Sequence, residues 1–236
     1  LLDTELRQQL KKTFILMNNL VNIVENDNDF KEKYESILPI KYPLYCYGLN
    51  KKKTCVKNSY NKPTIIQLKV KNNNQKPEKL KIMYKKEDIR KDVIIMNIIK
   101  TMNHILKQNG LDLNIITYNI LPNSDNDGFI EIVPNSKTIN EIYKSDFTIQ
   151  NYIMENNKDC KIQELRKRFT LSCAAYCVIS YLLGIGDRHL DNIMISNKGE
   201  LFHIDFGFIL GFDPKPLAPD MRITPEMVEA IGGENS

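Results

Sequence analysis

The sequence predicts an α+β fold with two lobes, and three observations lead to this prediction. Strand-like segments gather between residues 44 and 133, where one long helical segment interrupts them. From Ile139 onward, helical periodicity dominates. The chain has 236 residues and is 42% hydrophobic, which is enough for a buried core. We therefore expect a β-rich lobe at residues 1–133 and a helical lobe at 134–236, with a ligand-binding cleft between them.

The first lobe reads as an amphipathic helix followed by a small sheet. Residues 2–24 place apolar side chains at steps of three and four, which predicts a helix with one buried face. Pro39 and Pro43 then disfavour helix and indicate extended chain. Two strands are predicted at 64–70 and 80–85, joined by a polar hairpin loop.

A long helix leads into the mostly helical second lobe. Residues 88–108 carry an apolar stripe, and Gly110 follows where a helix C-terminus favours glycine. Another long helix is predicted over 165–183. The remaining short strands are predicted at 113–121, 128–133, 193–195 and 201–206.

Composition excludes several classes of protein. Every apolar run stops short of the roughly 18 residues that a membrane span needs, and the charged N-terminus does not fit a secretory signal. The five cysteines lack C-x-x-C spacing, and the three histidines do not pair with them at zinc spacing. We therefore expect a cytoplasmic protein with no transmembrane segment, no disulfide framework and no structural zinc.

The net charge of +4 is unevenly distributed. Residues 51–86 hold twelve lysines and one acidic residue, Glu78. This segment could bind phosphates, anionic lipid or nucleic acid, or it could be the solvated face of a sheet. Regular aromatic residues and a known reader motif are missing from it, which argues against nucleic acid as a partner.

The residues that indicate chemistry lie in two short segments of the second lobe. Two glycines end an apolar helix, so Asp187, His189 and Asn192 follow on one tight loop. Asp205 comes later, at the end of a predicted strand whose alternation puts His203 on the same side. A hairpin of this length brings Asn192 and Asp205 together, and Mg²⁺ accepts amide and carboxylate oxygens beside phosphate and water. Asp187 and His189 can accept or relay a hydroxyl proton.

These motifs resemble those of the phosphatidylinositol 3-/4-kinase superfamily, which includes related large protein kinases. The resemblance rests on Asp187-Arg188-His189 with Asn192, and on Asp205-Phe206-Gly207 at the matching distance. It implies a two-lobed, protein-kinase-like lipid kinase domain that uses ATP and Mg²⁺, with Mn²⁺ as a substitute. It also implies metal binding by Asn192 and Asp205 and catalytic roles for Asp187 and His189. We favour His189 as the base because imidazole changes charge near neutral pH.

The resemblance implies further contacts with the ATP phosphates. Lys85 closes a predicted strand and matches the phosphate-binding lysine, and Asp92 matches its acidic partner on the next helix. Lys86 is a rival, because the connection between them is one residue shorter than usual. Residues 56–63 match the loop that covers the phosphates, where Ser59 is the expected contact.

Adenine binding is implied for the segment that matches the hinge of the family, residues 128–133. There the Glu131 carbonyl and the Val133 N–H would bond the base. Considered alone, each residue expected to line the adenine pocket is better explained as part of the hydrophobic core. These residues are Tyr118, Ile130, Met194 and Ile204.

The activation loop suggests one class within the superfamily. Residues 207–224 carry Lys215 and Arg222 as their cations, which two aspartates balance. Such a loop has no spare charge for extra headgroup phosphates, and it resembles the class III phosphatidylinositol 3-kinases, the vacuolar protein sorting type. This implies transfer to the 3-hydroxyl of phosphatidylinositol in endosomal or vacuolar membranes, in trafficking and autophagy. Pseudokinase-type and autophagy subunits are the implied regulatory partners.

Two other functions remain open from the sequence. A phosphatidylinositol 4-kinase is the alternative enzyme, because Phe-Gly-Phe-Ile-Leu also occurs there. A non-catalytic nucleotide-binding scaffold is less favoured, because the full set Lys85, Asp187, Asn192 and Asp205 is present. We also expect the chain to be a fragment of a larger protein, with an incomplete second lobe.

Overall fold

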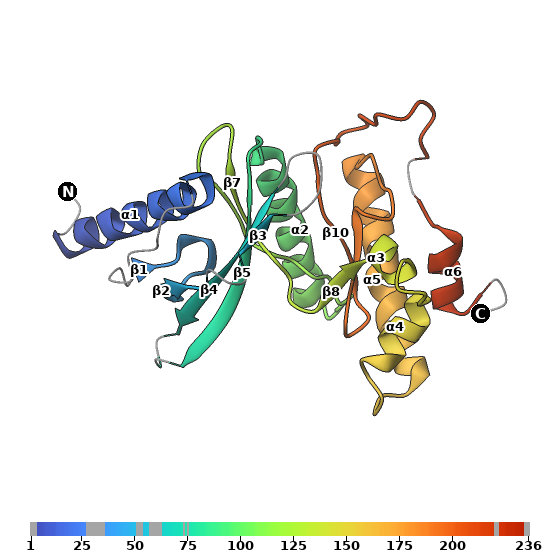
Figure 1. Ribbon diagram of the computed structural model, residues 1–236. Helices are drawn as coiled ribbons and strands as arrows, with labels where there is room; N and C mark the ends of the chain where they lie inside the picture. The colour runs from blue at the N-terminus through green and yellow to red at the C-terminus, as the bar shows by residue number, and fades with distance from the viewer. Residues whose placement is uncertain are drawn as a thin grey trace. The chain divides into compact units, whose positions relative to one another are not determined.

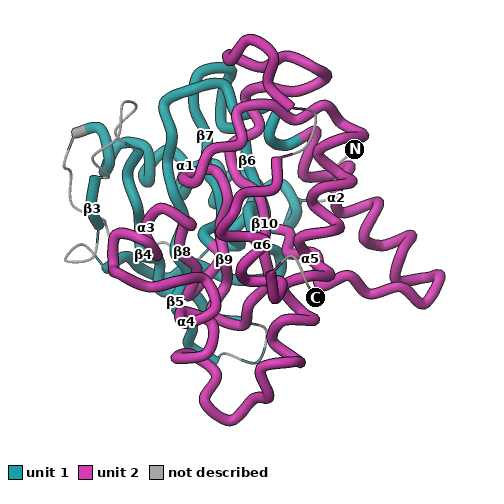
Figure 2. Tube along the Cα trace, turned by 90° about the vertical axis from the view of Figure 1, so that its right-hand side faces the viewer, with its two compact units in different colours: residues 1–93, 118–132 teal, residues 94–117, 133–236 magenta. Residues whose placement is uncertain are grey.

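The computed structural model describes residues 4–26, 36–50, 54–56, 63–72, 74, 76–219 and 222–233. The chain packs as two compact units, coloured separately in Figure 2. Unit 1 comprises residues 1–93 and 118–132, and unit 2 comprises 94–117 and 133–236. Helices and antiparallel sheet occur in both units, so the predicted α+β class is confirmed. The lobe division at 133/134 stays a prediction, and residues 94–117 pack with unit 2.

Unit 1 is built on an antiparallel sheet. Its strands, among the residues described, run in the order β1-β2-β4-β5-β7-β6, with β3 paired to β4. Helix α2 (Arg90–Gln108) begins in this unit. The other elements are α1 (Thr4–Asn26), β1 (Ser36–Ile37), the 3₁₀ turn η1 (Pro39–Lys41), β2 (Tyr45–Leu49), β3 (Cys55–Val56), β4 (Thr64–Lys71), β5 (Pro77–Lys85), β6 (Ile120–Pro122) and β7 (Gly128–Glu131).

The core of unit 1 lies between α1 and this sheet. Helix α1 lies beside β1 (Figure 1) and buries Leu16, Met17 and Leu20 against the strands. Alternate residues of the central strands face it, as the period of two predicts. These sheet residues include Ile66, Leu68, Val70, Leu80, Ile82, Tyr84 and Phe129.

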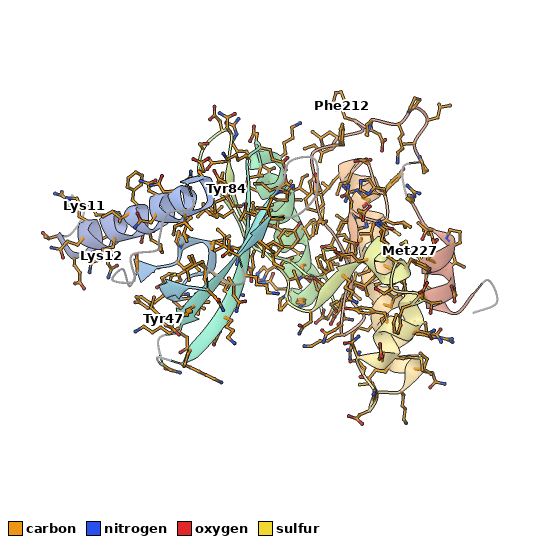
Figure 3. All side chains as sticks on the ribbon, in the orientation of Figure 1. Lys11, Lys12, Tyr47, Tyr84, Phe212 and Met227 are labelled. Atoms are coloured by element: carbon orange, nitrogen blue, oxygen red, sulfur yellow. The ribbon has the colours of Figure 1, made fainter. Side chains whose placement is uncertain are left out.

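The central hairpin is longer than the sequence predicted. Strands β4 and β5 pair without a break from Thr64 opposite Tyr84 to Lys71 opposite Pro77. Strand β5 also pairs with β7, which puts Lys85 opposite Gly128. The Tyr84 hydroxyl, labelled in Figure 3, donates to Asp127 Oδ2 at 3.0 Å. Lys85 therefore ends a strand that pairs with β4 on one side and with β7 on the other.

Unit 2 is mostly helical. Its long helix α5 buries Leu165, Phe169, Cys173 and Tyr176, and its strands pair in the order β10-β9-β8 among the residues described. Its elements after α2 are β8 (Ser136–Thr138), α3 (Ile139–Tyr143), α4 (Ile149–Glu155), α5 (Ile162–Leu183), β9 (Ile193–Ser196), β10 (Leu201–His203) and α6 (Pro225–Ile231).

Three predicted strands were too long, and the one predicted over 128–133 ends at Glu131. Residues 113–119 are not strand, because Asn114 adopts a left-handed φ of 53° and its N–H donates to the Asp112 carboxylate at 3.0 Å. The strand predicted over 201–206 ends at His203, and Asp205 takes a φ of 62°. Extended pairing cannot continue through a left-handed residue. We had expected His203 and Asp205 to lie on one face of a single strand. This expectation was wrong, because the strand ends at His203.

In the described part of the chain, no helix is both long enough and apolar enough to cross a membrane.

Candidate active site

A tight turn at the end of α5 begins the candidate site in unit 2. The Ile185 N–H bonds the Ser180 carbonyl at 2.9 Å, and Gly184 has a φ of 53°, as in a helix-ending glycine cap. The chain reverses there and enters the loop 185–192. Asp187, Arg188, His189 and Asn192 thus follow the buried helix directly.

Arg188 holds this loop to the segment after β10. Its side chain is buried and donates to the carbonyl oxygens of Gly186 and Ile204, each at 2.8 Å, and to that of Asp205. The planar guanidinium suits this task because its donors form a rigid fork. Arg188 thereby brings the loop and Asp205 together.

A backbone hydrogen bond brings together the chain segments of the two predicted metal ligands, Asn192 and Asp205. The Ile204 N–H donates to the Asn192 carbonyl at 3.1 Å, next to Asp205. Asn192 donates its side-chain amide to the Asp187 carbonyl at 3.0 Å, which leaves Oδ1 as the atom for a cation. Asp205 is exposed. The described residues contain no cluster of three or more His, Cys, Asp or Glu for a metal. An amide and a carboxylate fit a hard cation that keeps water and phosphate ligands.

Asp187 and His189 form the predicted proton-handling pair. His189 Nε2 lies 3.7 Å from Asp187 Oδ2, and their side chains are 40% and 23% exposed. The Asp191 N–H donates to His189 Nδ1 at 3.2 Å and so orients the ring. The imidazole is therefore both accessible and held beside a carboxylate.

His203 has a different environment. It is buried, and its Nδ1 lies 3.2 Å from Ser180 Oγ. Burial, together with the charge of Arg188, holds the pKa of His203 well below its usual value. His203 is therefore a neutral part of the core.

The activation loop, residues 207–224, is hydrogen-bonded to the loop 185–192, called the catalytic loop below, and to Gly184 just before it. Gly186 N–H donates to the Phe208 carbonyl at 3.0 Å, and Gly211 N–H donates to the Gly184 carbonyl at 3.0 Å. Further along, Asp213 Oδ2 accepts the Asp187 N–H at 2.7 Å. Phe212, labelled in Figure 3, is 75% exposed on this loop.

A cavity of about 240 Å³ lies within unit 2 at the two cations of the activation loop. Lys215 and Arg222 line it together with Asp187 and Arg188. Arg222 also donates to the Arg188 carbonyl at 2.8 Å. The structure therefore places both cations of residues 207–224 in one cavity with Asp187.

Lys85 and Lys86, the rival phosphate ligands of unit 1, have different surroundings. The Lys85 side chain is 12% exposed and lies 2.5 Å from Glu87 Oε1. Lys86 is 60% exposed and pairs with Glu25 at 2.9 Å. Asp92 is buried in the first turn of α2. Lys85 is thus the better-held side chain, while its partnership with Asp92 stays a prediction.

The residues predicted to bind adenine are only partly described by the structure. The Glu131 N–H bonds the Asn119 carbonyl at 2.8 Å, while its carboxylate accepts from Asn119 and Lys41. Tyr118 and Ile130 are buried in unit 1. Met194 and Ile204 are partly exposed in unit 2, as is Val133, whose carbonyl accepts from Ser136 Oγ. Ser59 lies outside the described residues.

Residues 79–236 match the family described as phosphatidylinositol 3- and 4-kinase. The chain belongs to this family. The match includes the catalytic loop, Asp205 and the activation loop.

Relatives of this phosphatidylinositol 3- and 4-kinase domain include a plant and a fungal protein. The chain is 42% identical over 162 residues to phosphatidylinositol 3-kinase, nodule isoform, of Glycine max, covering 66% of this chain and 20% of the relative. It is 41% identical over 155 residues to phosphatidylinositol 3-kinase VPS34 of Saccharomyces cerevisiae, covering 64% and 18%. The chain therefore spans about a fifth of these relatives.

Two residues that join the loops of this kinase domain were not singled out from the sequence. Arg188 stands inside the Asp-Arg-His motif, but its partners are backbone carbonyls that no side-chain pattern reveals. Asp213 had a usable signal. In Asp213-Pro214-Lys215, an aspartate stands two residues before a backbone N–H, which is typical of a turn closed by the aspartate side chain. Here the Lys215 N–H donates to the Asp213 carboxylate at 2.8 Å.

Proposed function

We propose that this chain is the kinase domain of a class III phosphatidylinositol 3-kinase. The observation that carries the proposal is the group Asp187, His189, Asn192 and Asp205, gathered around buried Arg188 in unit 2. The relatives named above support the choice of a 3-kinase. The reaction is transfer of the ATP γ-phosphate to the 3-hydroxyl of phosphatidylinositol.

In this proposal Asn192 and Asp205 bind Mg²⁺, which neutralises charge on the phosphates when bound. Lys85 contacts α- and β-phosphate oxygens, with Asp92 as its acidic partner, and Ser59 covers the phosphates. The Glu131 carbonyl and the Val133 N–H bond adenine. The side chains proposed to contact adenine are Tyr118 and Ile130 of unit 1 and Met194 and Ile204 of unit 2.

His189 removes the proton of the 3-hydroxyl, and Asp187 orients the imidazole. Their side chains lie 3.7 Å apart, close enough for them to act as a pair. Lys215 and Arg222 contact the lipid headgroup in the cavity that they line together with Asp187. Because two aspartates balance these cations, the preferred headgroup is unmodified phosphatidylinositol.

The proposed setting is the surface of endosomal or vacuolar membranes, in trafficking and autophagy. Regulatory pseudokinase-type and autophagy subunits are the proposed partners. A phosphatidylinositol 4-kinase is the second candidate, because the matching family description covers both enzymes.

The test is product identification with the full-length protein, Mg–ATP and phosphatidylinositol vesicles. We expect the 3-phosphate, whereas a 4-phosphate product would establish the second candidate instead. Asp205→Asn should lower turnover roughly a hundredfold or more while thermal unfolding stays unchanged, because a neutral amide binds the metal poorly. Asp159→Asn, on an exposed turn, is the matched control. Near-normal turnover of the Asp205→Asn variant would show that Asp205 is not a metal ligand.

A further inference from the structure

The activation loop supplies an acceptor that the catalytic loop lacks. Asp213 uses both carboxylate oxygens: Oδ2 accepts the Asp187 N–H at 2.7 Å, and Oδ1 accepts the Lys215 N–H at 2.8 Å. One carboxylate thus joins the backbone of the catalytic loop to that of the activation loop. Charged acceptors form stronger hydrogen bonds with backbone N–H groups than neutral ones do.

The residue held in this way has an unusual backbone conformation. Asp187 has a φ of 53°, in the left-handed region that residues with a Cβ seldom adopt. Such conformations persist where surrounding contacts impose them, and they often occur at functional sites. The bond from Asp213 is a contact of that kind, because it holds the N–H of the strained residue itself.

The neighbouring glycine makes this approach feasible. A Cβ on Gly186 would lie 2.5 Å from the Phe212 carbonyl oxygen and 2.8 Å from Asp213 Oδ2. Any larger residue there would push the activation loop away from the catalytic loop. The charge of Asp213 is also maintained. Burial acts against it, but the N–H groups of Asp187 and Lys215 and the charges of Lys215 and Arg188 lower the pKa of Asp213 overall.

We propose that Asp213 is a positioning residue for proton transfer: it fixes the Asp187 backbone and thereby the geometry of the Asp187–His189 pair. The activation loop then serves catalysis as well as headgroup contact, because displacing it releases Asp187. The kinetic part of this inference rests on the proposed function. The structural part, the bond between the two loops, does not.

The experiment compares Asp213→Ala and Asp213→Asn in the full-length protein. Asp213→Ala should lower kcat for phosphatidylinositol roughly tenfold to a hundredfold, as expected for a misplaced catalytic group. The KM for ATP should stay within about twofold, because the nucleotide contacts are untouched. Asp213→Asn should recover part of the loss, since its amide oxygen still accepts the Asp187 N–H. Asp159→Ala is the matched control for loss of a carboxylate.

Two further measurements separate positioning from general stability. Hydrogen exchange of the Asp187 amide should become faster in Asp213→Ala and stay slow in Asp159→Ala. In a His189→Ala background, removing Asp213 should cost much less than in the native enzyme, because both act through one pair.

Each outcome decides the proposal. Slow exchange at Asp187 in Asp213→Ala, or full activity in that variant, would overturn it. Equal losses in Asn and Ala variants would also overturn it, because a retained acceptor would then have no effect. If the native full-length protein phosphorylates no lipid, the proposed function fails, and the exchange rates still decide whether Asp213 holds Asp187.

Discussion

Lys85 and Lys86 are adjacent in the chain yet have different surroundings. Lys85 is nearly buried at the end of β5, whereas Lys86 is exposed and reaches α1 through Glu25. Alternation along an extended chain explains the difference, since successive side chains point to opposite faces. The sequence left both lysines open as phosphate ligands, and their burial favours Lys85.

Substitution of each lysine by alanine tests this choice. Lys85→Ala should lower kcat/KM for ATP about tenfold to a hundredfold, the value of a charge-assisted bond to phosphate. Lys86→Ala should change it less than about twofold, because exposed ion pairs contribute little. Steady-state kinetics with varied ATP distinguishes them. The reverse order would transfer the role to Lys86.

His189 should matter for the chemical step rather than for nucleotide binding. His189→Ala removes the proposed base, so kcat should fall about a hundredfold or more while the KM for ATP changes little. His104→Ala, on an exposed position of α2, controls for loss of an imidazole. A loss confined to ATP affinity would make His189 a nucleotide contact.

At the scale of elements, the junction of α5 and the activation loop depends on Gly184. Its φ is 53°, and a Cβ there would lie 2.4 Å from the Gly211 nitrogen. The Gly184 carbonyl also accepts a hydrogen bond from the Gly211 N–H. A side chain at position 184 would therefore meet backbone that cannot move without breaking this bond.

Two glycine substitutions separate conformational strain from this clash. Gly110→Ala should cost about 1–2 kcal/mol, since the left-handed φ of 77° is its only obstacle and nothing lies within 4 Å. Gly184→Ala should destabilise the protein by clearly more, because the backbone clash is added. Denaturant unfolding measures both. Equal losses would show that the activation loop does not press on this turn.

Regular elements were easier to predict from the sequence than the loops between them. Apolar spacing predicted α1, α2 and α5, because burial of one face imposes the helical period. The strand predicted from 113 failed at Asn114, where a local bond to Asp112 outweighs strand propensity. The proximity of Asn192 and Asp205 was predictable from their spacing. The roles of Arg188 and Asp213 were not predicted, because their partners are backbone groups.

At the scale of the whole molecule, charge distribution bears on lipid choice. The chain carries +4 overall, yet residues 207–224 balance Lys215 and Arg222 with Asp213 and Asp220. Each added phosphomonoester brings about −1.5 to −2 charges at neutral pH. The activation loop has no surplus cation to pair with it, so phosphorylated headgroups should be poor substrates.

A comparison of three lipids at matched surface density tests the central claim most directly. Catalytic efficiency of the full-length protein is measured on phosphatidylinositol, its 4-phosphate and its 4,5-bisphosphate. Unmodified phosphatidylinositol should be preferred and phosphorylated at position 3. Replacing Ala218 and Asp220 by lysines should extend activity to the phosphorylated lipids. A native protein that prefers the bisphosphate, or that phosphorylates position 4, would contradict the assignment.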